Sequence, residues 1–300
     1  MASTADISSP LPVAAPVAPR GRVSPIAWLI GPALLLFVIF FVLPFGAMAL
    51  LSFLSGNPVN SANVAFTTRH YERLMGDSLY LEALIATMRI GLVTTIVSLL
   101  IGYPLAHWMA RMHSRFGHAL LLMAVIAPML TGIVVRTFAW MTLLQDSGVI
   151  NTTLIAMGWI EQPIKLMYNE FGTVVALVHI YVPFMVLTLQ SVIEGIDRSV
   201  EEAAFSLGAA PATMFWRVLW PLALPGIIAG TILTFILGMN AYATPVLLGG
   251  PEFKMMGPLV FGVFQLNNWP FGAAVSFILM TTTLVLTASA NILMQRRYRR

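Results

Sequence analysis

The chain has 300 residues, of which 58% are hydrophobic and 9% are charged, with a formal net charge of +4 and a mean hydropathy of +0.86. Soluble domains carry about 25% charged residues, so this chain cannot cover a globule with solvated groups and lipid is its expected solvent. Its lack of Cys excludes a disulfide framework, a thiolate nucleophile and a Cys-based metal site.

Residues 1–25 are rich in Pro, Ala and Ser, which predicts a disordered N-terminal tail. Arg20 and Arg22 precede an apolar run, as they would in a signal peptide. Residues 26–45 alone are longer than the usual signal core, so we expect an uncleaved first membrane helix.

Six apolar runs are each long enough to cross a bilayer, which takes about 20 residues as a helix. The runs are continuous rather than alternating, and lipid demands backbone groups satisfied within each segment, so helices are favoured over strands. The expected spans are residues 26–53, 79–110, 118–144, 172–193, 222–247 and 271–294. A small-residue stripe on the fifth span (Gly226, Gly230, Thr234 and Gly238) predicts close packing against another helix.

The basic residues indicate the orientation, because cytoplasmic loops are enriched in Lys and Arg. They form no stripe interleaved with aromatic residues, which argues against nucleic-acid binding. With the N-terminus inside, the inner loops hold Arg20, Arg22, Arg111, Arg115, Arg198, Arg217, Arg296, Arg297, Arg299 and Arg300. The outer loops hold Arg69, Arg73, Lys165 and Lys254, while Arg89 and Arg136 fall within spans. Both termini are therefore expected in the cytoplasm, with Arg89 snorkelling outward.

Residues 197–221 form a part-polar stretch between the fourth and fifth spans, on the side expected to be cytoplasmic. Ser199 and Glu202 fit a capping box at the start of a short helix, with Asp197 as a competing cap. Gly208 can adopt the left-handed geometry that ends a helix.

A second short helix is expected after this turn, at residues 212–219, because Pro211 suits a helix start. Pro221 and Pro225 are expected to reset the chain direction before the fifth span. The stretch then reads as helix, glycine turn, helix along the membrane surface. An amphipathic connector in the headgroups is the simpler alternative.

The pattern Glu202-Ala203-Ala204, three residues, Gly208, nine residues, then Val218-Leu219-Trp220-Pro221 resembles the EAA loop of ABC importer membrane subunits. In that family the loop docks coupling helices into a cleft of a separate ATPase subunit. The resemblance implies a coupling role for Glu201, Glu202, Ala203, Ala204, Gly208, Ala209, Pro211, Phe215, Trp216 and Arg217. The chain itself carries no phosphate-binding loop, since neither Lys165 nor Lys254 follows a Gly.

Two further stretches, residues 127–151 and 242–274, resemble the polyamine-type permeases of this family. The resemblance implies an all-α, six-span subunit of a bacterial inner membrane, without catalytic residues, metal or cofactor of its own. Expected partners are two ATPase subunits that bind ATP and Mg²⁺, a second permease subunit that is homologous or identical, and an external solute-binding protein. Many polyamine carriers have acidic residues where this chain has Ala241 and Val246, so either the partner supplies the charge or the solute is different.

Polar and aromatic groups retained inside the spans are candidates for the solute path. They are Thr131, Arg136 and Trp140 in the third span, His179 in the fourth, and Asn240, Tyr242 and Thr244 in the fifth. Interhelical hydrogen bonding is the alternative for each, and is favoured for Arg136 and His179. Pro245 can break the fifth helix and expose backbone groups there.

We therefore expect a permease domain at residues 26–294, with its coupling loop at about 197–221 and a basic cytoplasmic tail at 295–300. Its solute is expected to be a small organic molecule of the polyamine kind. The alternatives are a permease for an amino-acid-like, phosphonate or other anionic solute, and a self-sufficient channel or secondary transporter. A membrane enzyme is disfavoured because no catalytic constellation is found.

Overall fold

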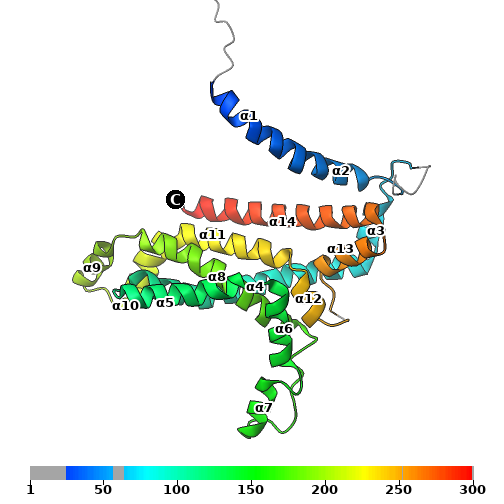
Figure 1. The fold of residues 1–300 in the computed structure, drawn as a ribbon. Helices are drawn as coiled ribbons and strands as arrows, with labels where there is room; N and C mark the ends of the chain where they lie inside the picture. The colour runs from blue at the N-terminus through cyan, green and yellow to red at the C-terminus, as the bar shows by residue number, and fades with distance from the viewer. Residues whose placement is uncertain (1–24, 57–63, 252, 299–300) are drawn as a thin grey trace, which may run out of the picture. The chain divides into compact units, whose positions relative to one another are not determined.

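The computed structural model describes residues 25–56, 64–251 and 253–298, and the chain there is mostly helical (Figure 1). The β pairing among these residues is one isolated bridge between Leu54 and Phe66. Within the described part, five helices are long and apolar enough to cross a membrane, and a bent pair makes a sixth. The expected tail at residues 1–25 falls outside the described part except for Pro25, where the first helix begins.

The chain divides into two units, residues 1–47 and 48–300. The first span consists of α1 (Pro25–Phe37), a single π-helical turn η1 (Val38–Val42) and α2 (Leu43–Leu51). This confirms the span expected at residues 26–53. The aromatic rings of Phe37, Phe41 and Phe45 stack at successive i, i+4 positions along it.

The second unit begins with a short helix, α3 (Arg69–Gly76), and is built around four long helices. Figure 1 shows these long helices side by side: α4 (Ser78–Arg111), α8 (Glu170–Glu194), α11 (Trp220–Met239) and α14 (Trp269–Tyr298). Helices α4, α8 and α11 contact one another, and α14 packs against α11. The spans expected at 79–110 and 172–193 are confirmed within two residues, and the span expected at 271–294 lies within α14.

The small-residue stripe of α11 faces these neighbours, as expected. A Cβ at Gly226 would lie 2.8 Å from Val192, and one at Gly230 would lie 2.7 Å from the Met185 sulfur, both on α8. At Gly238 the nearest atom would be the Cα of Gly91 on α4, at 3.1 Å. Side chains at these positions would force the helices apart, so the glycines set the close packing of the core.

The third expected span is wrong as a single straight helix. Helix α5 (Arg115–Ile126) continues into a 3₁₀ turn, η2 (Ala127–Leu130), and the chain then bends by 98° before α6 (Ile133–Leu144) and α7 (Val149–Ala156). Thr131 and Gly132 have extended backbone angles at the bend. Pro128 contributes no N–H to the last turn, which helps end the first segment.

The fifth expected span begins too late, and its prolines do not redirect the chain. Helix α10 (Pro211–Met214), a π turn η3 (Phe215–Leu219) and α11 form one continuous helix, Pro211–Met239. In the π turn the N–H of Trp220 bonds the Phe215 carbonyl five residues back, which loosens the ladder just before Pro221. The second short helix, expected at residues 212–219, is thus the first part of the fifth span rather than a separate surface helix.

The same span ends earlier than expected, at Met239. The chain breaks at residues 240–242 and resumes as α12 (Ala243–Leu248). Helix α13 (Met256–Gln265) then leads to α14, and its first turn is tied to α4 because the N–H of Met256 donates to the Thr87 hydroxyl at 2.9 Å. The break therefore lies between the packed core and a set of short helices.

Candidate functional site

The part-polar loop forms a capped helix, α9 (Arg198–Ser206), at the end of the second unit where α4 terminates. Asp197 is its N-cap, and its carboxylate accepts from the N–H of Ser199 at 2.9 Å. The capping box expected from Ser199 and Glu202 is wrong, because the helix begins two residues earlier than that box requires. This hydrogen bond is the main cause of a lowered pKa for Asp197.

Gly208 ends this helix as expected. Its φ is +82°, in the left-handed region that favours glycine. The N–H of Ala209 bonds the carbonyl of Ala204, and the N–H of Gly208 bonds the carbonyl of Phe205. This pair of bonds is a Schellman motif, which satisfies the last carbonyls of α9 and turns the chain toward Pro211.

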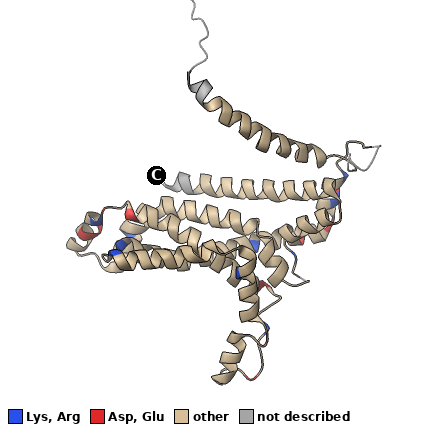
Figure 2. Ribbon diagram, viewed as in Figure 1, with Lys and Arg blue, Asp and Glu red and all other residues tan. Residues whose placement is uncertain are grey.

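Two adjacent acids of α9 lie in different surroundings. Glu201 pairs with Arg111 at the end of α4, with Nε 2.7 Å and Nη2 2.5 Å from the same carboxylate oxygen. Glu202 is exposed and forms no ion pair among the described residues. Figure 2 shows acidic and basic residues gathered at this end of the unit. The sequence analysis assigned both acids to the coupling loop but did not predict the ion pair between Arg111 and Glu201.

Apolar side chains are also exposed on this loop. Leu207 is 89% exposed, beside the Gly208 turn, and Trp216 is 61% exposed. Phe215 is partly buried, with its ring 5.4 Å from that of Tyr103 on α4. Among the expected coupling residues, Phe215 therefore packs within the chain, and the ring of Trp216 lies against those of Phe215 and Trp220 while remaining largely exposed. Arg217 is exposed. Leu207 was missed because an isolated Leu beside a Gly carries no signal in sequence.

The predicted path residues fall around two breaks in the helices. Thr131 is exposed at the bend before α6, and Asn240 is exposed at the break after α11. The amide nitrogen of Asn240 donates to the Ile236 carbonyl at 2.8 Å, which leaves its oxygen available. The ring of Tyr242 lies 4.5 Å from that of Phe261 on α13.

Thr244 is almost fully buried, and its hydroxyl is 3.0 Å from that of Thr137 on α6. This contact is of the interhelical kind that was the alternative for each path residue. It joins α12 to α6 beside the break.

Arg136 and His179 lie on α6 and α8, with the ring of Trp140 5.6 Å from that of His179. Arg136 is 8% exposed, and its Nε and Nη1 atoms have no hydrogen-bond partner among the described residues. The same holds for Nδ1 of His179. The hydrogen bonds expected to anchor these two side chains are thus missing from the described part of the chain. Leaving a buried charge unpaired is costly, so these atoms are candidates for contact with a group outside the described part of the chain.

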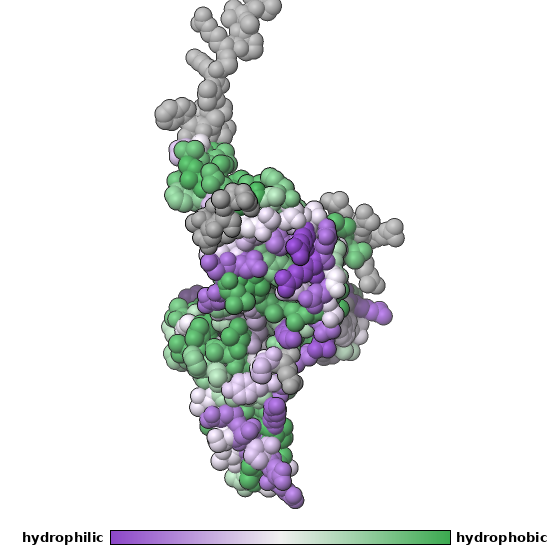
Figure 3. Space-filling view, turned by 90° about the vertical axis from the view of Figure 1, so that its right-hand side faces the viewer, coloured by the Kyte–Doolittle hydropathy of each residue, from purple (hydrophilic) through white to green (hydrophobic). Residues whose placement is uncertain are grey.

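Two other features bear on the path. Arg89 pairs with Glu170 in the first turn of α8, at the end of that helix expected to face outward. Its side chain is 59% exposed, so this contact agrees with the outward snorkelling that was expected. Figure 3 looks onto the end of the second unit that carries α3 and α13, where hydrophilic side chains gather beside apolar ones. The charged residues of α3 (Arg69, Glu72 and Arg73) lie at this end, near the start of α4, whereas α9 lies near the end of α4.

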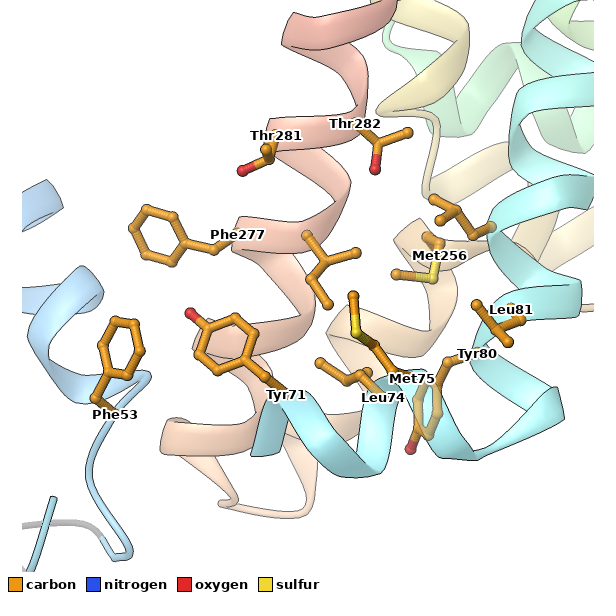
Figure 4. Close-up of a pocket in the computed structure, with 12 residues that line it drawn as sticks. Phe53, Tyr71, Leu74, Met75, Tyr80, Leu81, Met256, Phe277, Thr281 and Thr282 are labelled. Atoms are coloured by element: carbon orange, nitrogen blue, oxygen red, sulfur yellow. The ribbon is translucent and has the colours of Figure 1, made fainter. Parts of the chain in front are cut away.

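A cavity of about 540 Å³ lies between α3, the start of α4 and α14. Figure 4 shows Tyr71, Leu74, Met75, Met256 and Phe277 around it. Its lining is apolar apart from the hydroxyls of Tyr and Thr side chains and contains no charged residue. A charged solute would lose its hydration there without compensation, so the lining of this pocket is unsuited to binding one.

The chain matches the family described as "Binding-protein-dependent transport system inner membrane component" over residues 98–300. It is 36% identical to the spermidine/putrescine permease PotB of Haemophilus influenzae, covering 87% of this chain and 92% of that protein. The PotB protein of Escherichia coli K12 is 34% identical, with 83% and 89% covered. These relatives are transport permeases rather than enzymes.

The fold is also similar to that of solved importers. A subunit of a bacterial ABC transporter for the acidic polysaccharide alginate matches with a TM-score of 0.72 at 18% identity, covering 91% of this chain and 96% of that one. The MetNI methionine transporter matches with a TM-score of 0.53 at 18% identity, covering 76% and 97%. The chain therefore belongs to the family of inner membrane components of binding-protein-dependent transport systems, as a multi-pass permease subunit of an ABC importer.

Proposed function

We propose that this permease imports a small organic cation of the polyamine kind, as one half of a two-subunit pathway. The observation that carries the assignment is the identity of 34–36% to PotB proteins over more than four fifths of the chain. The complete importer has two permease subunits, two ATPase subunits and an external binding protein. ATP and Mg²⁺ are bound by the ATPase subunits, and both termini of this chain lie in the cytoplasm with α9.

The path residues offer a weak cation site at the break after α11. The Asn240 amide oxygen, the ring of Tyr242 and backbone carbonyls near Pro245 are groups that attract a cation. An aromatic face contributes about 0.5–2 kcal/mol to such a contact, which suits a site that must also release its cargo. The acids absent at Ala241 and Val246 are then supplied by the second permease subunit. Trp140, His179 and Thr131 border the same path.

The exposed part of the 197–221 loop docks into the ATPase. Glu202 and Leu207 form the contact surface, with Trp216 and Arg217 beside them. Gly208 and Pro211 hold the turn between the two helical segments, and Ala203, Ala204 and Ala209 allow close approach. The exposure of three large apolar side chains on this loop, Phe205, Leu207 and Trp216, supports this role, because grouped exposed apolar residues mark sites of protein interaction.

A second candidate solute is an anionic or zwitterionic molecule. Arg136 favours it, because two of its buried nitrogens have no partner in the described part of the chain. A carboxylate of the solute would pair with this guanidinium in the same bidentate way as a carboxylate side chain.

The test is uptake by the complex of permeases, ATPase and cognate binding protein reconstituted in liposomes. ATP-dependent uptake of radiolabelled spermidine or putrescine is expected. Glu202→Lys is expected to release the ATPase or to uncouple its hydrolysis from uptake. Uptake of neither polyamine, together with transport of an anionic or zwitterionic solute, overturns the polyamine assignment. Normal solute-stimulated hydrolysis in Glu202→Lys overturns the docking assignment.

A further inference from the structure

We propose that Arg111 and Glu201 form a clamp that joins the coupling helix α9 to the core helix α4, so that the two move as one rigid body during transport. This inference rests on the proposed coupling role of the loop and assigns a mechanical function to the acid that precedes the EAA-like motif. Glu201 and Arg111 are positioning residues, which act on transport by holding α9 in place.

The geometry of the pair sets it apart from an ordinary surface ion pair. Arg111 is the last residue of α4, and its Nε and Nη2 both contact one carboxylate oxygen of Glu201. The same Nη2 also donates to the carbonyl of Ile196, at 3.1 Å. The two charged side chains are only 15% and 14% exposed, so water and salt screen them little.

A second contact, from the first residue of α9, repeats the connection. Nη1 of Arg198, the first residue of α9, lies 3.1 Å from Nε2 of His113, in the loop that follows α4. Nη2 of Arg198 reaches the Ala110 carbonyl at 3.5 Å. Arg111 therefore reaches from α4 to α9, and Arg198 reaches back from α9 to α4. Two crossed connections resist rotation of α9 about its attachment far better than one.

Helix α4 is placed to carry a movement from α9 to the outer half of the unit. It is 34 residues long, and at about 1.5 Å per residue it spans the whole bilayer. In the first half of α4, Thr87 accepts from the N–H of Met256 at the start of α13, and Gly91 lies against Gly238 of α11 just before the break. A displacement of α9 by the ATPase would thus reach the short helices around Asn240 and Tyr242 through one continuous helix.

The neighbouring acids then have separate tasks. Glu202 faces away from the chain and meets the ATPase, whereas Glu201 faces α4 and transmits the force. Loss of Glu202 should weaken ATPase binding. Loss of Glu201 should leave the ATPase bound but let α9 move without α4, so that ATP is hydrolysed without a matching amount of transport.

The first test measures the ratio of solute transported to ATP hydrolysed in the reconstituted complex. Glu201→Gln and Arg111→Gln are each expected to lower this ratio at least about fivefold, the lower end of typical coupling between sites, while the ATPase still co-purifies. The exchanged pair Arg111→Glu with Glu201→Arg should recover much of the loss. Glu161→Gln, in an exposed loop, controls for the lost charge and should behave as the wild type. Wild-type ratios in both single variants would overturn the clamp, and so would an exchanged pair no better than either of them.

The second test uses the absence of Cys from the chain. Arg111→Cys with Glu201→Cys removes the ion pair and places two thiols where it was. A short, reducible bifunctional thiosulfonate reagent should restore the coupling ratio by rejoining α9 to α4, and a reductant should abolish it again. A cross-link that blocks transport would show that α9 must move relative to α4, and would overturn the proposal.

A third measurement separates the clamp from the choice of solute. Spin labels on Trp108→Cys in α4 and Ser206→Cys in α9, both at exposed positions, report the distance between the helices. This distance should stay constant between the nucleotide-free and ATP-trapped complex, and should broaden when Glu201→Gln is added. A change with nucleotide in the otherwise unaltered chain overturns the clamp, even if polyamine uptake is observed. Failure of polyamine uptake alone overturns only the solute assignment.

Discussion

Polar groups have partners of different kinds in the loop at residues 197–221 and at the break after α11. In the loop, three of the charged groups are bonded within the chain: Asp197 to the Ser199 N–H, Glu201 to Arg111, and Arg198 to His113. Around the path, buried nitrogens of Arg136 and His179 have no partner in the part of the chain that the structure describes.

This difference fits the proposal that the loop is complete within this chain, whereas the solute path is completed by a second permease subunit. Burying an unpaired guanidinium costs several kcal/mol, so we expect another molecule to pair with Arg136 in the assembled importer. The loop, by contrast, needs only an exposed surface for its partner. Substitutions in the loop should therefore change the amount of solute transported per ATP hydrolysed. Substitutions at the break should change how well the solute is bound and transported.

The largest effect is expected at Gly208, where the loop's helix ends. An added Cβ would meet nothing within 4 Å, so only the backbone geometry opposes a side chain. At a φ of +82° a β-branched residue is disfavoured by about 1–2 kcal/mol or more. Gly208→Val should lose most solute-stimulated hydrolysis, whereas Gly208→Asn should keep much of it, because Asn tolerates this region. Equal activity of the two variants would show that the turn geometry is unimportant.

Tyr242 tests the other side of the comparison. If its ring attracts a cationic solute with about 0.5–2 kcal/mol, Tyr242→Ala should reduce transport by about 2- to 30-fold and leave basal hydrolysis in place. Tyr242→Phe should remain close to wild type, because the ring is kept. Since Tyr242 also packs on Phe261, Phe261→Ala serves as a control for lost packing. A defect in Tyr242→Phe as large as in Tyr242→Ala would assign the effect to the hydroxyl.

A smaller effect is expected at the buried hydroxyl pair beside the break. Thr244→Val keeps the shape of the side chain but removes its bond to Thr137, which costs about 1 kcal/mol. Thr137 still donates to the Ile133 carbonyl at 2.9 Å. The melting temperature of the purified complex should fall slightly, with no change in KM for the solute. A changed KM would indicate that Thr244 contacts the solute, as the sequence analysis predicted.

Much of the fold follows from the sequence because lipid imposes length and continuity on each span. The boundaries near residues 78, 111, 170 and 194 could be predicted, since polar residues mark the ends of apolar runs there. The bend at Thr131 and the uninterrupted helix through Pro221 could not. Proline leaves backbone carbonyl groups without their usual helical hydrogen bond. Whether the helix then bends or continues depends on the partners that neighbouring helices or a π turn provide.

Within the sites, local signals were readable and distant ones were not. The left-handed turn at Gly208 depends on a few consecutive residues, so its spacing predicts it. The pairing of Arg111 with Glu201 joins residues 90 positions apart, as the pairing of Arg89 with Glu170 joins residues 81 apart. One sequence contains no information on such contacts beyond opposite charge. The role of each acid in the loop could therefore be assigned only from the structure.

The smallest expected effect concerns the cap at Asp197 and its dependence on pH. The hydrogen bond from the Ser199 N–H lowers the pKa of this carboxyl, with the charge of Arg111 adding to it. A lowered pKa means that the ionised cap stabilises α9 above the ordinary pKa of an Asp, and that this stabilisation is lost as the pH falls through the lowered value. Between pH 6 and 5 the cap is fully ionised, so hydrogen exchange of the first α9 amides should be constant there. Below about pH 4 their exchange, corrected for the intrinsic effect of pH, should accelerate.

Asp197→Asn keeps a good cap without a titrating group and should remove the acceleration, while Asp197→Ala should exchange fast at every pH. Because this cap holds only the end of a helix that Arg111 already secures, transport at neutral pH should change little in Asp197→Asn. A strong transport defect in that variant would mean that the charge of Asp197, and not its hydrogen bond, contributes to coupling.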